Sequence, residues 1–171
     1  MYNFFEAEAQ REGKPLVKIN MDETAIPLVP KSFRGVVIQG DASQREAQLV
    51  RFRAGRNKTR MNLTYMAFVT DDAELNRKLP QIVIMSNASV TQRVFKELHE
   101  NAPGHFFLVR RVKAWTTGPI LVDVIKVLST ILKQERPDHA YILAFDCAAS
   151  HMGNEVFQAL RSHAIFTLLV L

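Results

Sequence analysis

The sequence predicts an α/β domain in which helices cover a partly parallel β-sheet. The last third of the chain alternates strand, helix and strand over residues 140–145, 154–162 and 165–171, as parallel strands with crossover helices do. After Pro119, apolar side chains recur with a period of about 3.6 residues, which predicts a long helix that stops at Pro137. The length of 171 residues, 47% of them hydrophobic, suits one domain with a buried core.

The first half of the chain predicts mainly strands. A short helix over residues 4–12 is broken at Gly13 and Pro15, and an apolar strand from Leu16 to Ile19 then ends in the polar triplet Asp22-Glu23-Thr24. Residues 27–58 are rich in Pro, Gly and charge, so we expect an irregular, exposed excursion with a short strand or hairpin arm at residues 36–38. Further strands are expected at residues 61–70 and 81–85, as antiparallel neighbours, and at 106–112.

Composition predicts an intracellular protein that does not enter a membrane. The single cysteine, Cys147, excludes an internal disulfide, and no His/Cys cluster has the spacing of a zinc site. The N-terminus lacks the basic and apolar regions of a secretory signal, and no apolar run is long enough to span a bilayer. We therefore expect residues 1–15 to form an N-terminal helix and linker, and residues 16–171 to form one domain.

Positive charge is concentrated in one segment. The formal net charge is +5, and the window from Arg45 to Arg60 alone holds six basic residues against one acid. Such a window suits a phosphate backbone. A solvated, arginine-rich loop explains the charge equally well.

Two acids stand where apolar strands run out, Asp22 after residues 16–21 and Asp146 after residues 141–145. If the two strands are neighbours, the carboxylates converge, and Mg²⁺ is commonly held by one or two carboxylates together with phosphate oxygens. Either aspartate taken alone is more often a turn former or a helix cap.

Two motifs surround the acids: residues 19–24 read Ile-Asn-Met-Asp-Glu-Thr, and Asp146 is followed five residues later by His151. They resemble the first and second signatures of the pogo/jerky branch of the DDE-superfamily endonucleases. Residues 78–84, Lys-Leu-Pro-Gln-Ile-Val-Ile, resemble the strand between them, and Trp115-Thr116 precedes the long helix as it does in the family. The chain departs from the family at Cys147, where Asn is usual, and at residues 71–74, Asp-Asp-Ala-Glu, which replace a small Gly-containing turn.

The resemblance implies a ribonuclease-H-like mixed sheet with flanking helices and metal-dependent DNA strand cleavage and transfer. Asp22 and Asp146 would be catalytic, metal-binding carboxylates for Mg²⁺ or Mn²⁺, and Glu23 and His151 would support them from nearby. DNA would be the partner, self-association is left open, and the location would be nuclear. The basic residues expected to contact the DNA backbone are Arg56, Lys58, Arg60, Arg110 and Arg111.

The family's third carboxylate follows the strand that here reaches Leu171, so we expect a C-terminally incomplete catalytic domain that does not cut DNA by itself. The alternative is a transposase-derived, non-catalytic module that binds DNA or protein, and a further one is an unrelated α/β fold. His151 has a second interpretation, as a helix N-terminal residue bonded to backbone. We expect Trp115 in the core rather than as a platform for base stacking.

Overall fold

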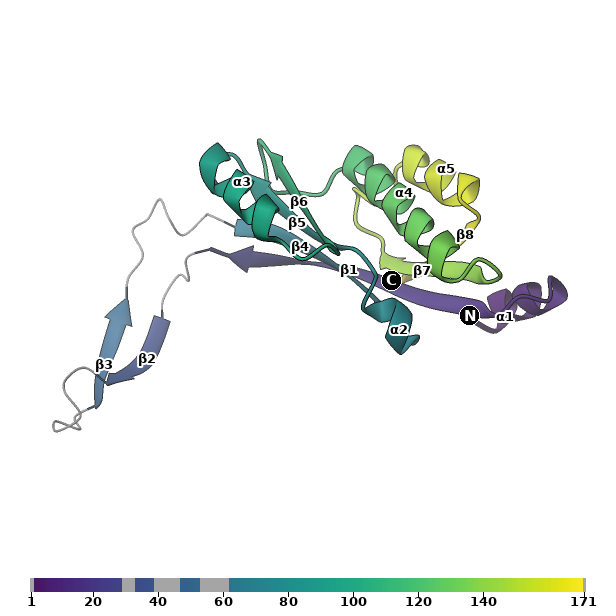
Figure 1. The fold of residues 1–171 in the computed structure, drawn as a ribbon, viewed down its shortest axis with the longest axis horizontal. Coiled ribbons are helices and arrows are strands. Elements are labelled where there is room, and N and C mark those ends of the chain that lie inside the picture. Colours follow the sequence, from purple (N-terminus) through teal and green to yellow (C-terminus); the bar gives the residue numbers. More distant parts are fainter. Residues whose placement is uncertain (1, 29–32, 39–46, 53–61, 171) are drawn as a thin grey trace.

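The structure is a computed structural model that describes residues 2–28, 33–38, 47–52 and 62–170 (Figure 1). The helices are α1 (Tyr2–Arg11), α2 (Ala73–Asn76), α3 (Gln92–Asn101), α4 (Gly118–Glu135) and α5 (Asn154–Ser162). The strands are β1 (Leu16–Pro27), β2 (Phe33–Ile38), β3 (Ala47–Phe52), β4 (Asn62–Thr70), β5 (Gln81–Ser86), β6 (Phe106–Arg111), β7 (Ala140–Asp146) and β8 (Ile165–Val170).

The main sheet has six strands in the order β6-β5-β4-β1-β7-β8. Strand β1 runs antiparallel to β4 and parallel to β7, β4 and β5 are antiparallel, and the two outer pairs, β5–β6 and β7–β8, are parallel. The predicted class, a mixed sheet with flanking helices, is confirmed, as is the antiparallel pairing of the strands predicted at residues 61–70 and 81–85. This order places β1 and β7 side by side in the middle of the sheet.

Strand β1 is much longer than predicted. It does not stop before the polar triplet but continues to Pro27, because its pairing with β4 runs from Ile19↔Thr70 to Pro27↔Asn62. Its pairing with β7 ends earlier, at Asn20↔Ala144. Among the described residues, no strand pairs with residues 21–27 on the β7 side, so this stretch of β1 forms an open edge.

Helices α4 and α5 cover one face of the sheet (Figure 1). Helix α4 begins with Pro119 in its first turn, as predicted, and turns a stripe of apolar side chains toward the core, including Leu121, Leu128 and Leu132, each at most 1% exposed. Full burial of one such side chain contributes about 1.5–3 kcal/mol. On the other face, Phe5 of α1 packs 5.5 Å from the ring of Phe166 in β8.

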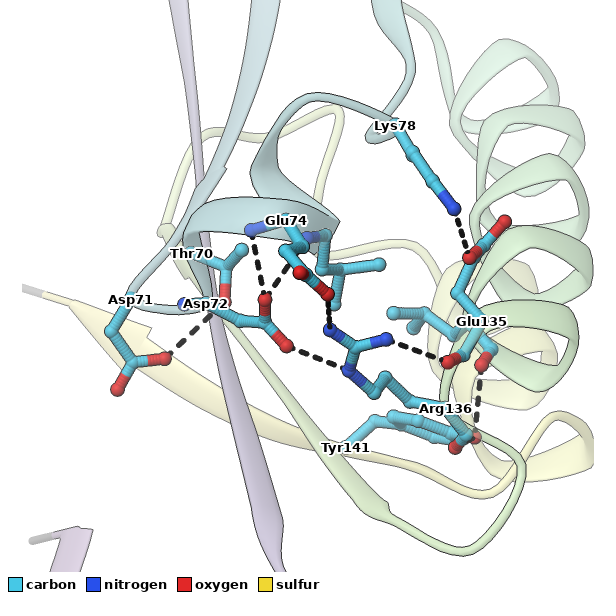
Figure 2. Close-up of polar contacts among 10 residues, drawn as sticks. Thr70, Asp71, Asp72, Glu74, Lys78, Glu135, Arg136 and Tyr141 are labelled. Carbon is cyan, nitrogen blue, oxygen red and sulfur yellow. Dashed lines mark hydrogen bonds and ion pairs between the residues drawn. The ribbon is translucent and has the colours of Figure 1, made fainter.

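A polar clamp fixes the β4–β5 connection to the end of α4 (Figure 2). Asp72 caps α2 by accepting hydrogen bonds from the backbone N–H groups of Glu74 and Leu75, and its other oxygen pairs with Arg136 Nε at 2.7 Å. The backbone carbonyl of Arg136 accepts a hydrogen bond of 2.6 Å from the hydroxyl of Tyr141 in β7. The Asp-Asp-Ala-Glu segment that departs from the family pattern is therefore a capped helical turn held by a distant arginine.

Besides α2, two elements were not predicted. Helix α3 is capped by the Thr91 hydroxyl and buries no residue, although Val94, Phe95 and Leu98 lie at helical spacing on one side of it. The segment predicted as an irregular excursion contains β3 in addition to the short strand expected near residues 36–38, and β2 and β3 pair as a separate two-stranded sheet with Phe33 opposite Phe52. Across the part of the chain that the structure describes, no helix combines the length and apolarity needed to cross a membrane.

Candidate functional site

Asp22 and Asp146 lie on neighbouring parallel strands, which is the condition for their carboxylates to converge. The last residue pair between β1 and β7 is Asn20↔Ala144, two residues before each aspartate. Successive side chains of a strand alternate between the two faces of a sheet. Phe145 belongs to the core on the α4 face together with Met21, so Asp22 and Asp146, one residue further along each strand, both belong to the opposite face.

Each aspartate is exposed and partly held by its own backbone. Asp22 Oδ1 accepts a hydrogen bond of 2.8 Å from the N–H of Glu23. Asp146, whose side chain is 61% exposed, uses Oδ1 to accept a hydrogen bond of 3.2 Å from Ala148 N–H and to pair with His151 Nδ1 at 2.6 Å. Among the described residues, neither Oδ2 atom has a recorded hydrogen bond or ion pair. Each carboxylate thus keeps one oxygen without a protein partner among the described residues.

The donor set suits a hard divalent cation. Carboxylate oxygens are the ligands that Mg²⁺ and Mn²⁺ prefer, and Mg²⁺ usually keeps several waters or substrate phosphate oxygens beside one or two carboxylates. Within the described ranges, no group of three or more His, Cys, Asp or Glu residues is arranged to hold a metal. The residues that could hold such an ion are Asp22 and Asp146, with the remaining positions left to water or phosphate.

Glu23 lies on the opposite face of β1 from Asp22 and joins three segments of the chain. Its Oε1 atom is 2.8 Å from His151 Nε2, and its Oε2 atom accepts a hydrogen bond of 2.6 Å from the Thr116 hydroxyl. Strand β1 is thereby tied to the loop after β7 and to the segment before α4. Thr116 was not singled out by the sequence, although it follows Trp115 in the family-like motif.

His151 stands between Glu23 and Asp146 and is only 3% exposed. Its Nδ1 atom also lies 3.2 Å from the backbone carbonyl of Asp146, and its ring meets Phe145 edge-on at 5.7 Å. The hydrogen bond to Glu23, followed by that to the backbone of Asp146, raises the pKa of His151 against the opposing effect of burial. When the ring is protonated, both of its nitrogens donate, one to Glu23 and one to Asp146. The His151 ring contacts the two carboxylates, as expected of a group that supports the acids. It also contacts the backbone, as expected of a residue that only precedes a helix.

Of the basic residues expected to contact DNA, the two that the structure describes, Arg110 and Arg111, lie on β6, three strands away from β1. Arg110 lies on the edge strand β6, and its guanidinium donates to the Val90 carbonyl at 2.7 Å and to Gln92 Oε1 at 3.0 Å. These bonds give Arg110 a structural role in fixing the loop before α3. Arg111 is exposed, and β5 and β4 separate its strand from β1. The other three basic residues, Arg56, Lys58 and Arg60, lie outside the described residues.

Trp115 was expected in the core, and that prediction is wrong. Its side chain is 72% exposed, in the segment between β6 and α4, and Lys113 Nζ lies 5.8 Å from the centre of its ring. The core beneath α4 is instead filled by residues such as Ile120 and Val124. The hydrophobicity of a side chain alone does not distinguish an exposed position, such as that of Trp115, from a buried one beneath α4.

Comparison with known proteins bears on the fold. No protein-family model matches the sequence, and no curated protein matches it. Similar solved structures include a Mos1 transposase paired-end complex with the left transposon end, with a TM-score of 0.52, and a Mos1 mariner paired-end complex with Mn, with a TM-score of 0.50. Each is 15% identical to this chain, and the alignment covers 97% of this chain but only 39% of the other. The chain therefore has the mixed α/β fold found in Mos1 transposase, over about two fifths of that protein's length.

Proposed function

We propose that this chain carries a transposase-type core for metal-dependent DNA strand cleavage and transfer, similar to the pogo/jerky branch, in which Asp22 and Asp146 bind Mg²⁺ or Mn²⁺. The observation that carries the proposal is the position of these aspartates on adjacent parallel strands, on the same face of a sheet whose fold resembles Mos1 transposase. The Mos1 structure that contains Mn supports the choice of metal.

Each residue of the site has a distinct role in the proposal. A bound divalent metal lowers the pKa of an attacking water or hydroxyl group and stabilises the leaving oxygen of a phosphodiester. Asp22 and Asp146 supply the oxygens that hold it. His151 fixes Oδ1 of Asp146 and so sets the direction in which the other oxygen points, while Glu23 holds the His151 ring in place from the opposite face of β1.

Mn²⁺ binding tests the two carboxylates directly. Asp22→Asn and Asp146→Asn should each weaken Mn²⁺ binding, measured by water-proton relaxation, by about tenfold or more, since loss of even an indirect partner of a metal ligand costs about 10–100-fold. The matched control is Asp123→Asn, which neutralises an acid of α4 that is 69% exposed. Affinity that is unchanged in both site variants, or lowered equally in the control, would contradict the proposal.

The second part of the proposal is that the protein binds the phosphate backbone of DNA. The Mos1 complex with a transposon end supports this part. Replacing Arg56, Lys58 and Arg60 together with Gln should make the dependence of log affinity on log salt shallower, by up to about 2.7 for three lost phosphate contacts. The control replaces two exposed basic residues of α3, Arg93 and Lys96, with Gln. A slope that the triple substitution leaves unchanged would mean that the window is only solvated surface.

We further propose that the 171-residue chain binds metal and DNA but nicks supercoiled DNA only at background rate. The family that it resembles positions its metals with a third carboxylate, and within the described residues no group of three such ligands is arranged to hold a metal. Rate depends on groups held to a fraction of an ångström, so a metal with fewer fixed ligands loses most of its advantage. Metal-dependent nicking that Asp22→Asn abolishes would refute this part. DNA binding without any Mn²⁺ effect would instead favour the non-catalytic module.

A further inference from the structure

We propose that Trp115 is a stacking platform for an unpaired base of the DNA strand that enters the Asp22–Asp146 site. The proposal deepens the proposed function, because it assigns part of the substrate to a surface beside the acids. It depends on four features of the structure: the exposure of Trp115, its fixed backbone, the positive charge around it, and its position relative to β1.

The indole of Trp115 is exposed on a rigid part of the chain. The residue before it, Ala114, is 8% exposed, and its carbonyl accepts a hydrogen bond of 2.5 Å from the Thr64 hydroxyl in β4. The residue after it, Thr116, donates to Glu23 in β1. The backbone on both sides of Trp115 is thus fixed to the sheet. A large apolar ring that is held in water by a fixed backbone is prepared to contact a ligand at little entropic cost.

Two surface hollows meet at Trp115. One has a volume of about 290 Å³ and extends toward Ala25 of β1, and the other has a volume of about 510 Å³ and extends toward Pro119 of α4. Val112 and Lys113 line both hollows together with Trp115. The ring therefore forms a wall beside open space rather than the floor of a closed pocket.

Charge selects the class of ligand. Among the described residues that line the two hollows, the charged ones are Arg111 and Lys113, both positive. Lys113 Nζ lies 5.8 Å from the centre of the Trp115 ring. A flat ring beside cations is the combination with which proteins bind single-stranded nucleic acid, since the base stacks on the ring and the phosphate meets the cation. A nucleotide satisfies both features.

The platform lies across β1 from the aspartates. Thr116 is bonded to Glu23, the residue after Asp22, and Glu23 projects from the opposite face of the strand. Residues 21–27 of β1 have no described partner strand on the β7 side. A DNA strand that crosses this open edge can therefore meet the aspartates on one face and Trp115 on the other, and its base at the crossing must be unpaired to stack.

The chain contains a single tryptophan, so its fluorescence reports on this residue alone. The probe is a single-stranded oligothymidine of about 12 nucleotides, within the usual range of site sizes, and the comparison is a blunt duplex of the same length. We expect the single strand to quench the emission strongly and the duplex to quench it weakly. By anisotropy of a labelled oligothymidine, Trp115→Ala should weaken binding by about tenfold, the size of one base–aromatic stack, and Trp115→Phe should retain most of the affinity.

The matched control is Phe4→Ala, which removes another aromatic ring that is 64% exposed, on α1. Emission that the oligothymidine leaves unchanged, or equal losses of affinity in Trp115→Ala and Phe4→Ala, would overturn the proposal. Emission that shifts with protein concentration in the absence of DNA would also overturn it, in favour of a contact between protein molecules. The Mn²⁺ titrations of the Asp22 and Asp146 variants do not depend on Trp115, so failure of the metal site and failure of the platform are separate results.

Discussion

Removal of the His151 side chain should destabilise the protein measurably. In His151→Ala, Glu23 Oε1 and Asp146 Oδ1 lose partners at 2.8 and 2.6 Å. Breaking a fully buried ion pair costs about 3–5 kcal/mol. The Asp146 side chain is 61% exposed and can be solvated again, whereas Glu23 is only 21% exposed. Because only one of the two carboxylates is left poorly solvated, we expect a loss of about 2–3 kcal/mol.

Urea unfolding followed by circular dichroism measures this loss. With an m-value of about 2 kcal/mol/M, the midpoint should fall by about 1 M or slightly more. His99→Ala is the matched control, because His99 is an exposed histidine of α3, and substitutions at such sites change stability by about 0.5 kcal/mol or less. A double-mutant cycle with Glu23→Gln should give a coupling energy of about 1–2 kcal/mol. Equal midpoints for the two alanine variants, or a coupling energy near zero, would refute the reasoning.

Two further predictions concern the core and the clamp. Leu128→Ala, at a site that is 0% exposed, should cost about 2–5 kcal/mol in urea unfolding, whereas Val69→Ala, at a site that is 49% exposed, should cost far less; similar costs would contradict the described packing. The hydrogen bond from Arg136, followed by that from Leu75 N–H, lowers the pKa of Asp72 in the folded protein. The charged carboxylate therefore stabilises the fold at any pH above the pKa that Asp72 has in the unfolded chain. This contribution is lost as the pH falls through the lower pKa of the folded state. Asp72→Asn, which keeps the cap, should therefore lower the urea midpoint at pH 7 and converge with the wild type below pH of about 4; a gap that persists in acid would show that the charge is not the cause.

The elements with strong local periodicity could be predicted from the sequence. Helix α4 repeats its apolar residues every turn and buries that stripe, and α5 begins and ends where predicted. Strand β1 was underestimated because its second half is exposed and polar. It persists as a strand through pairing with β4, and such pairing leaves no local pattern. Helix α3 was also missed, although Val94, Phe95 and Leu98 lie at helical spacing.

In the candidate site, too, the residues set by local sequence could be predicted, whereas contacts between residues far apart in the chain could not. Asp22 and Asp146 could be found because each follows an apolar run and each lies in a recognisable motif. His151 could be named from the same motif, but its contact with Glu23 and that of Thr116 could not be predicted, because both residues are far from Glu23 in sequence and reach it only after the sheet has formed. Trp115 was placed in the core because its side chain is large and hydrophobic. Its exposure depends instead on the tertiary contacts of its two chain neighbours, Ala114 and Thr116.

These contacts make the two faces of β1 interdependent. Asp22 belongs to one face, while Glu23, directly after it, fixes His151 and Thr116 on the other. His151 in turn fixes Oδ1 of Asp146, which shares a face with Asp22. A shift of the segment before α4 would therefore move Glu23, which is bonded to Thr116. Glu23 is joined to Asp22 by the backbone and to Asp146 through His151, so both aspartates would be displaced. If a base stacks on Trp115, it acts on the residue next to Thr116, so occupation of the platform and the geometry of the carboxylates should be coupled, with Glu23 as the residue through which the coupling passes.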